Sequence, residues 1–361
     1  MLTKKKIWVS VDETTDVTGR FVANVVIGTL EIDRAGEIFL LHSEELEKTN
    51  HSTIFKLFDK AMGILWPEGV QHDNVLLFLS DAAPYMVKAG KCINTLYSKC
   101  IHLTCLAHAF HRIAEKIRGE FSDVDKVVAS VKKVFRKSPV RIKTFLNMTN
   151  NEIPLPPEPI LTRWGTWINA TLYYCEHFSK IHSVIQTFDD DDAASIKTAK
   201  KYLKKSNLPC QLTFIKANFE FLPRAITFLE KRGTKLSDSL KIIEDTKNKI
   251  SHLKCTKAIP IVNKMNDVLD KNSGYNIVLK IYKILSGVVE NLEGLPEDMT
   301  NDDLAYFNYA PITSVDVERS FSIYKNLLSS NRRRFTFENI RKYLIVQCNF
   351  QETQNDSELM M

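Results

Sequence analysis

The sequence predicts an α/β protein in which a mixed five-stranded sheet, flanked by helices, is followed by an all-α region. Three observations lead to this prediction. Three short β-rich runs follow one another near the start of the chain, with only short turns between them. Two further apolar runs then alternate with helical patterns. After these runs, strand patterns cease and helical periodicity dominates most of the remaining chain.

The first three strands are predicted at Ile7–Asp12, Phe21–Leu30 and Glu37–Leu41, where β-branched and aromatic residues gather. The segments that join them are short and contain the turn residues Asp, Thr and Gly. Because short links connect consecutive strands, we expect these strands to form an antiparallel meander.

The next part of the chain alternates between helix and strand. Helices are predicted at Ser52–Trp66, Pro84–Lys99 and Cys105–Arg118, and strands at Asn74–Asp81 and Ile101–Thr104. The run over residues 74–81 is almost continuously apolar, which is typical of a strand buried on both faces. The first helix has one apolar face, formed by Ile54, Leu57, Phe58, Ala61, Met62 and Leu65.

This order of elements predicts a topology. Three antiparallel strands followed by right-handed βαβ crossovers give a mixed sheet with helices on both faces. That is the topology of the RNase H-like fold. We therefore predict residues 1–150 as the first part of an RNase H-like core, 151–300 as an all-α insertion domain, and 301–361 as the final helices of the core.

The predicted insertion is dominated by long helical patterns, for example at Leu161–Ile185, Leu212–Lys231 and Val278–Leu292. The proline-rich segment Ile153–Pro159 cannot form a helix and is interpreted as an extended connector. The four aspartates Asp189–Asp192 are interpreted as a solvated loop, because clustered like charges repel unless a cation lies among them.

Residues Pro311–Asn349 predict an amphipathic hairpin of two helices. Thr313 and Asp316 have the spacing of a capping box at the start of the first helix. Glu318 lies at the edge of that helix's apolar stripe, so its carboxylate is either a solvated rim charge or a ligand directed into a cleft. The stripe itself consists of Val317, Phe321, Tyr324 and Leu328.

The composition of the 361 residues excludes several classes of protein. Charged residues make up 25% and hydrophobic residues 44%, a balance that is ordinary for a globular protein and argues against long disorder. The net charge of +6 permits a polyanionic partner without requiring one. No apolar run approaches the roughly 20 residues of a membrane span, and no signal peptide is visible. The seven cysteines are scattered and form no CxxC pair, so we expect reduced thiols in an intracellular compartment.

Three carboxylates are predicted to meet at one edge of the sheet. Asp12 ends the first predicted strand and Asp81 ends the fourth, and these two strands are neighbours in the predicted sheet. Glu318 joins them if its helix packs over that edge. Carboxylates in a cleft repel one another, and two bound Mg²⁺ or Mn²⁺ ions would relieve the repulsion and support phosphodiester chemistry. Asp16 competes with Asp12, and each aspartate alone is also explained as a strand-end or turn residue.

Five motifs resemble those of the hAT superfamily of DNA transposases, and they occur in the family's order. They are SVDETTD at 10–16, FLSDAAPYM at 78–86, TCLAHAFH at 104–111, LTRWGTW at 161–167 and a C-terminal signature at 314–340. The resemblance implies that Asp12, Asp81 and Glu318 form a metal-binding DDE triad. It also implies that the C-terminal signature is the hAT dimerisation region. The implied reaction is hydrolysis at a transposon end, hairpin formation on the flanking DNA, and strand transfer to a target.

The resemblance also implies DNA contacts. Cys105 and His108 would lie near the cleaved DNA end. Arg163 would lie there too, and Trp164 would be the platform on which a flipped base stacks. Without the resemblance, Trp164 and Trp167 are explained as core residues on one helix face. The densest basic run is interpreted either as a grip on DNA phosphate or as a solvated turn, and it consists of Arg332, Arg333 and Arg334.

Four residues spaced by three invite a zinc interpretation, namely His102, Cys105, His108 and His111. On a helix, this spacing rotates successive side chains by about 60°, so the first and the last would face opposite ways. His102 is also predicted to lie in a strand. We therefore expect no structural zinc here.

The sequence departs from the family pattern at its start. Family members carry an N-terminal BED zinc finger and a dimerisation segment ahead of the first Asp strand, whereas that Asp is residue 12 here. We therefore expect either an excised catalytic core or a genomic remnant, with a shortened insertion domain.

Two functional hypotheses follow. The first is a hAT-like transposase core, active or domesticated, that acts on transposon ends and target DNA with Mg²⁺ or Mn²⁺. The second is a non-catalytic DNA-binding or dimerisation module with the same fold, and a metal nuclease acting on RNA follows from the fold alone. We expect a homo-oligomer through the C-terminal region, no membrane partner and, by the resemblance, a nuclear location. The candidate dimer surface is also explained by packing against the sheet, and it consists of Phe335, Phe337, Ile340, Tyr343, Leu344 and Val346.

Overall fold

A computed structural model describes residues 4–160, 165–328 and 336–350. The chain divides into two compact units. The first contains Met1–His108, Leu229–Lys241 and Leu269–Met361, and the second contains Ala109–Phe228 and Ile242–Val268. The division into domains at residues 150 and 300 stays a prediction.

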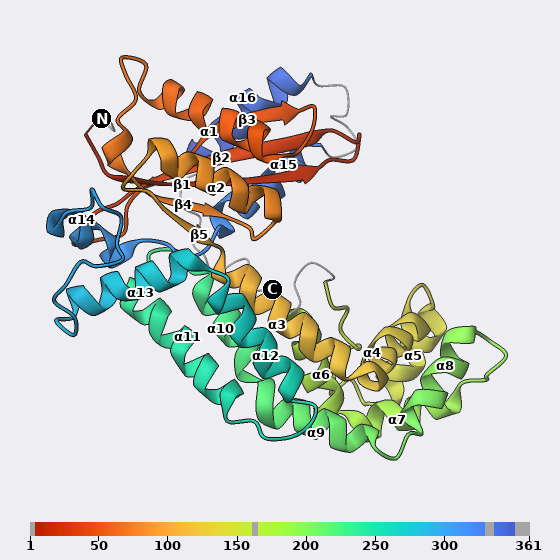
Figure 1. Cartoon of the computed structure of the whole chain (residues 1–361). Helices are drawn as coiled ribbons and strands as arrows, with labels where there is room; N and C mark the ends of the chain where they lie inside the picture. The colour runs from red at the N-terminus through yellow and green to blue at the C-terminus, as the bar shows by residue number, and fades with distance from the viewer. Residues whose placement is uncertain (1–3, 161–164, 329–335, 351–361) are drawn as a thin grey trace. The chain divides into compact units, whose positions relative to one another are not determined.

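The first unit contains a five-stranded sheet (Figure 1). Its strands are β1 (Ile7–Thr15), β2 (Phe21–Thr29), β3 (Ile38–Leu46), β4 (Val75–Ser80) and β5 (Ile101–Thr104). The spatial order is β3-β2-β1-β4-β5, in which β1, β2 and β3 pair antiparallel while β4 pairs parallel with both β1 and β5. The mixed five-stranded sheet and the α/β class are therefore confirmed.

Helices cover both faces of this sheet. On one face lie α1 (His51–Leu65) and α2 (Pro84–Leu96), and on the other lie α15 (Val315–Leu327) and α16 (Phe337–Phe350) (Figure 1). All six residues of β4 are buried, as its continuous apolar pattern predicts. The core under α1 and α2 includes Val9, Val11, Val25, Ile54, Phe58, Met62, Phe78, Met86 and Ile93.

Local signals explain where α1 and α2 begin. The Asn50 side chain accepts hydrogen bonds from the backbone N–H groups of Ser52 and Thr53, and Thr53 completes a capping box. Pro84 stands in the first turn of α2, where its missing N–H costs no helical hydrogen bond.

The prediction that Asp12 ends the first strand is wrong. β1 continues to Thr15, which pairs with Phe21 of β2, so Asp12 lies inside the strand opposite Asn24. The reason is the tight turn that follows. The Asp16 carboxylate accepts hydrogen bonds from the backbone N–H groups of Thr18 (2.8 Å) and Arg20 (3.0 Å), which brings the two strands together up to the turn.

Strand β5 lies close to two helices that each approach it through a glycine. A Cβ added to Gly90 of α2 would lie 2.3 Å from Nδ1 of His102. A Cβ added to Gly274, in α13 (Ser273–Leu285), would lie 2.2 Å from the backbone oxygen of His102. The His102 ring stacks on Phe78 with its centroid 5.0 Å away. These glycines allow both helices to pack directly on the edge strand.

The stability of the fold is expected to fall as the pH drops from about 6.5 towards 4, partly because of His102. Burial lowers the pKa of His102 to about 4, so the imidazole stays neutral in the fold when it is already protonated in the unfolded chain. Stability is therefore complete above the unfolded pKa of about 6.5 and is lost below it, by up to roughly 3 kcal/mol. Urea unfolding at several pH values between about 4.5 and 7.5, where histidine titrates, measures how the unfolding free energy changes with pH.

His102→Gln is the matching variant, because an amide does not titrate. Its unfolding free energy should depend less on pH than that of the wild type. His42, whose pKa is also lowered by burial, keeps its contribution in both proteins. Equal slopes in the two proteins would contradict the assignment to His102.

The first helix of the predicted C-terminal hairpin buries its predicted stripe, since Val317, Phe321, Tyr324 and Leu328 are all buried. The predicted capping box is wrong. The N-terminal cap of α15 is Ser314, whose side chain makes no capping hydrogen bond. The Asp316 carboxylate instead contacts Arg232 (2.5 Å) and Arg319 (2.9 Å), because two guanidinium groups offer it stronger partners than a helix N–H.

Helix α16 covers the edge strand β3. The Asn349 side chain accepts from the backbone N–H of Leu40 at 2.8 Å and donates to its carbonyl at 3.1 Å. It thereby occupies backbone groups that an edge strand leaves unpaired. The described part of the candidate dimer surface is divided: Ile340 and Leu344 are buried, whereas 55% of the surface of Tyr343 and of Val346 is exposed. Phe335 lies outside the described residues.

The first unit is completed by α14 (Asn301–Ala305) and a short 3-10 helix at Tyr306–Tyr309, with another at His72–Asn74. Asp303 of α14 is buried and forms ion pairs with Lys6 at 2.9 Å and Lys99 at 2.8 Å. These pairs fix the segment that precedes α15.

The described part of the second unit contains helices and no strand, and residues 152–160 between α5 and α6 are not helical. The predicted helix over 161–185 is interrupted at His177, and the one over 212–231 at Glu220. In the first unit, the helix predicted over 278–292 ends at Leu285, because Gly287 takes a positive φ of 71°. The remaining helices are α3 (Leu106–Glu120), α4 (Ser122–Phe135), α5 (Pro139–Met148), α6 (Gly165–Glu176), α7 (Phe178–Thr187), α8 (Ala194–Leu203), α9 (Leu208–Phe219), α10 (Phe221–Leu229), α11 (Leu236–Ser251) and α12 (Ile259–Asp270).

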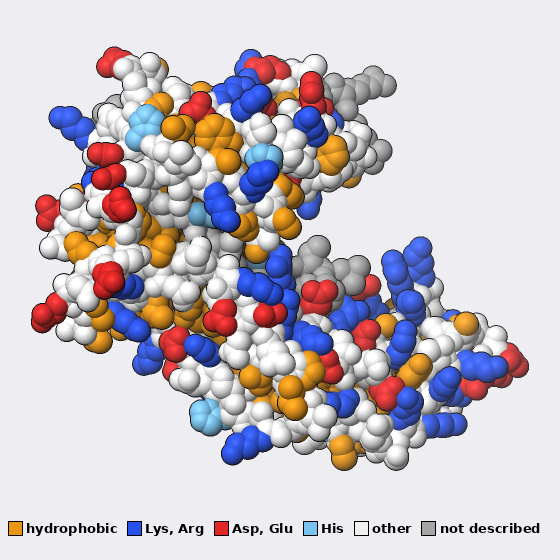
Figure 2. Space-filling view, viewed as in Figure 1, with side chains coloured by type: hydrophobic (Ala, Val, Ile, Leu, Met, Phe, Trp, Pro, Cys, Tyr) orange, Lys and Arg blue, Asp and Glu red, His pale blue; other side chains and the backbone are white. Residues whose placement is uncertain are grey.

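Within the described residues, no helix combines the length and the apolar character needed to cross a membrane. On the face shown in Figure 2, basic and acidic side chains are interspersed over both units, in keeping with the small net charge of +6.

Candidate active site

Asp12 is a buried carboxyl group on the sheet face that α15 covers. It keeps 9% of its surface exposed and lies opposite Asn24, whose amide nitrogen donates to Ser320 of α15 at 2.7 Å. Burial raises the pKa of Asp12 well above its usual value, and the negative charges of Glu318 and Glu13 raise it further. A buried acid surrounded by other acids is typical of a functional site.

Glu318 lies in the first turn of α15, close enough to Asp12 for hydrogen bonding between the two carboxyl groups to contribute to its lowered pKa. Two carboxyl groups form such a contact only by sharing a proton. The pKa of Glu318 is lowered, mainly by its hydrogen bond with His108, while that of Asp12 is raised. Burial and the neighbouring charges therefore favour the protonated form of Asp12, whereas the contact with His108 favours the ionised form of Glu318.

His108 and Cys105 support Glu318 from the start of α3. The His108 Nε2 atom lies 3.3 Å from the Glu318 carboxylate. His108 is also hydrogen-bonded to the Cys105 sulfur, and the negative charge that this sulfur carries as a thiolate is the main reason why the pKa of His108 is raised to about 11. Burial alone would raise the pKa of Cys105, but His108 and the Ser314 N–H together lower it.

Asp81 directly follows β4, as the sequence predicts. Its carboxylate accepts a hydrogen bond from the backbone N–H of Ala83 at 3.0 Å, which forms the turn into α2. Its charge also contributes to the raised pKa of Asp12. The structure thus brings Asp12 and Glu318 close together and places Asp81 near enough to interact with Asp12 electrostatically.

Glu13 and Tyr85 belong to the same cluster and are not among the residues predicted from sequence. The Tyr85 hydroxyl donates to the Glu13 carboxylate. Burial raises the pKa of Glu13, and the charge of Asp81 raises it further. Because side chains alternate along a strand, Glu13 leaves β1 on the face opposite to Asp12. The sequence signal was available, since Glu13 directly follows Asp12 in the first motif.

Asp16, the alternative to Asp12, is occupied by structural contacts. It forms an ion pair with Arg20 at 2.7 Å and accepts a hydrogen bond from the hydroxyl of Tyr324 at 2.8 Å. Burial opposes ionisation of Asp16, but hydrogen bonds from Thr18, Arg20 and Tyr324 outweigh it and lower the pKa. Asp16 therefore fixes α15 on the β1–β2 hairpin.

The donor set matches a hard divalent cation in its chemistry, because three carboxyl groups supply oxygen ligands and Glu13 has a buried oxygen without a hydrogen-bond partner. The positions of these carboxyl groups match a metal site less well than their chemistry does. Over residues 4–160, 165–328 and 336–350, no group of three or more His, Cys, Asp or Glu side chains is arranged so that it could hold a metal ion.

The predicted DNA contacts are only partly described. Arg163, Trp164 and the run Arg332–Arg334 lie outside the described residues. Cys105 is described and is buried, with 3% of its surface exposed. Trp167 is a core residue of the second unit, and its indole N–H donates to Asp125 at 3.1 Å.

The four residues that invited a zinc interpretation have different surroundings. His102 lies in β5 and its Nε2 is 2.9 Å from the Ser80 hydroxyl, whereas His108 contacts Glu318. The absence of a structural zinc stays a prediction.

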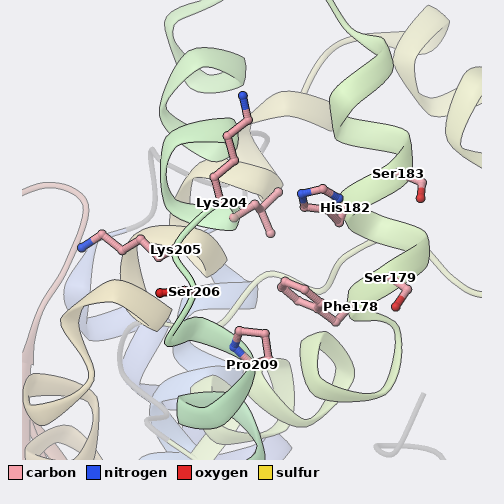
Figure 3. A pocket seen from close by; sticks show the side chains of 9 residues that line it. Phe178, Ser179, His182, Ser183, Lys204, Lys205, Ser206 and Pro209 are labelled. Atoms are coloured by element: carbon pink, nitrogen blue, oxygen red, sulfur yellow. The ribbon is translucent and has the colours of Figure 1, made fainter.

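A separate groove of about 460 Å³ lies within the second unit. Figure 3 shows Phe178 and His182 of α7 on one side, and Lys204 and Pro209 on the other. It shares no residue with the acidic cluster.

The model of one protein family, described as a domain of unknown function (DUF659), matches residues 1–134. This family is associated with hAT-type transposase-like proteins. The matched region contains all five strands, Asp12, Asp81, Cys105 and His108, but not Glu318. No curated protein matches the chain. The family match suggests a transposase-like origin.

Proposed function

We propose that this chain contains the catalytic core of a hAT-like transposase, which cleaves DNA and transfers a DNA strand with the help of divalent cations. Asp12, Asp81 and Glu318 are the proposed DDE triad. The observation that supports this most directly is the packing of α15 on β1 and β2, which places Glu318 beside the buried Asp12 from a widely separated part of the chain.

The energetics of the cluster favour this proposal over a structural role. Burying the Asp12 carboxyl group beside other acidic groups is unfavourable, because desolvation and repulsion by Glu318, Glu13 and Asp81 all oppose its ionisation. A fold that needed only packing at this position would be better served by apolar side chains. Two Mg²⁺ or Mn²⁺ ions would balance these charges, activate a water or a 3′-hydroxyl, and stabilise the leaving oxygen of a phosphodiester.

The proposed substrate is a transposon end together with its target DNA. Arg163 and the run Arg332–Arg334 are proposed to contact phosphates, and Trp164 to stack on a flipped base. Assembly of two copies is proposed through the exposed part of α16. Exposed apolar residues there are spaced on one helix face, and they are Tyr343, Val346 and Phe350.

Manganese binding tests the triad. Titration of the full chain with Mn²⁺ should give a saturable site, which Asp81→Asn should weaken by about a hundredfold or more, since even outer-shell partners of metal ligands are worth roughly 10–100-fold. Asp33→Asn removes the same charge from an exposed loop and should leave the affinity unchanged. If Asp81→Asn binds Mn²⁺ as tightly as the wild type does, the proposed metal site is wrong.

A joining assay tests the chemistry. A DNA duplex with a free 3′-hydroxyl should become joined to plasmid DNA in the presence of Mg²⁺, and Asp81→Asn should not support this reaction. Binding of metal without joining would favour the second function.

The second candidate function is a non-catalytic DNA-binding or dimerisation module. The specific observation that favours it is that no group of three potential metal ligands has converged among the described residues. In that case DNA binding and self-association would be retained while the joining assay stays negative.

A further inference from the structure

The junction between β5 and α3 is hydrogen-bonded to both elements that lead to the proposed triad. The backbone N–H of Cys105 donates to the Ser80 carbonyl at 2.8 Å, next to Asp81. The backbone N–H of Leu106 donates to the Ile312 carbonyl at 3.1 Å, in the segment that enters α15. A shift of this junction would therefore affect the positions of both Asp81 and Glu318.

The Cys105 side chain continues this connection. Its sulfur is buried and accepts a hydrogen bond from the backbone N–H of Ser314 at 3.2 Å. Ser314 is the N-terminal cap residue of α15 and makes no capping hydrogen bond with its own side chain. Cys105 thus holds the start of α15 from outside the helix.

His108 holds the same helix one turn later. Its Nε2 atom is 3.3 Å from the Glu318 carboxylate, and its ring is hydrogen-bonded to Cys105. Residues 314 and 318 are one helical turn apart, so the two contacts fix both the axial position and the rotation of α15 at the level of Glu318.

We propose that Cys105 and His108 are positioning residues, which hold the Glu318 carboxylate against Asp12 through the first turn of α15. Cys105 acts on Glu318 without touching DNA, because its sulfur is enclosed by Ser314 and His108. The consequence for metal affinity rests on the proposed function, whereas the consequence for the position of α15 does not. Outer-shell partners of metal ligands typically change affinity by roughly 10–100-fold.

The test compares Cys105→Ala and Cys105→Ser with Cys100→Ala in the full chain. Cys100 is a matched control, because it is also a buried cysteine but belongs to the core under α1 and α2. Two quantities are measured in each protein: Mn²⁺ affinity, from the electron paramagnetic resonance signal of the free ion, and deuterium uptake of the peptide that spans α15. His108→Ala serves as the second variant should Cys105→Ala not fold.

We expect Cys105→Ala to weaken Mn²⁺ binding by about tenfold and to accelerate exchange in α15. Cys105→Ser keeps a hydrogen-bond acceptor, so it should lose less Mn²⁺ affinity than Cys105→Ala and show slower exchange in α15. Cys100→Ala should alter neither, even where it lowers the melting temperature equally.

The outcomes separate the two proposals. If the wild type binds no Mn²⁺ but exchange in α15 still responds to Cys105→Ala, the metal site fails and the positioning role stands. If the wild type binds Mn²⁺ while folded Cys105→Ala or His108→Ala changes neither affinity nor exchange, the positioning role is overturned.

Discussion

Asp12→Asn is expected to abolish DNA joining and, at the same time, to raise the melting temperature of the metal-free protein. Loss of a carboxylate that supports metal-assisted phosphodiester chemistry removes several kcal/mol of transition-state stabilisation, which corresponds to a rate loss of roughly a thousandfold. Without metal, the buried Asp12 is opposed by desolvation and by the charges of Glu318 and Glu13. The neutral amide avoids that cost, so the two effects have opposite signs.

The measurements are a plasmid-joining assay in Mg²⁺ and thermal melting in EDTA. Asp16→Asn is the informative comparison, because it makes the same chemical change four positions away. Asp16 accepts hydrogen bonds from Arg20 and Tyr324, so its replacement should lower the stability by about 2 kcal/mol. A drop in melting temperature for Asp12→Asn in EDTA would show that its charge stabilises the fold, contrary to the proposal.

Gly274→Ala is expected to produce a large loss of stability in the first unit. The new Cβ would lie 2.2 Å from the backbone oxygen of His102 and 2.7 Å from the Cα of Leu103. Both atoms belong to the backbone of β5, so no side chain can rotate away, and α13 must separate from the strand. Overpacking of this kind costs typically about 3 kcal/mol, and more where the backbone must move.

Urea unfolding of Gly274→Ala and Gly63→Ala gives the comparison. Gly63 lies in the exposed part of α1 with open space where its Cβ would stand. Alanine there should stabilise the helix by about 0.5–1 kcal/mol. Equal stability of the two variants would mean that the approach of α13 to β5 is not a tight packing constraint.

Much of the fold was predictable because its signals are local. The continuous apolar run over residues 74–81 predicted a strand buried on both faces, and β4 is buried throughout. The short links between the first three strands predicted their antiparallel pairing, which the register of β1 with β2 confirms. The apolar spacing from Val317 to Leu328 likewise predicted the buried face of α15.

The errors arose where non-local contacts override a local signal. Asp12 stands inside β1 rather than at its end, since pairing with β2 extends the strand to Thr15. The Thr313–Asp316 spacing matches a capping box, but Asp316 contacts Arg232, a residue far away in the sequence. Glu13 and Tyr85 were not predicted as site residues, because their contact joins segments that are far apart in the sequence.

The sequence by itself determined the order of strands and helices and supplied the carboxylates, because periodicity and residue chemistry are properties of short segments. Only the tertiary structure decided which of these groups meet. Asn24, Asp16 and Cys105 each anchor a different turn of α15, and together they bring Glu318 to Asp12. No local pattern encodes that contact, since it depends on how a late helix packs on the first strand of the sheet.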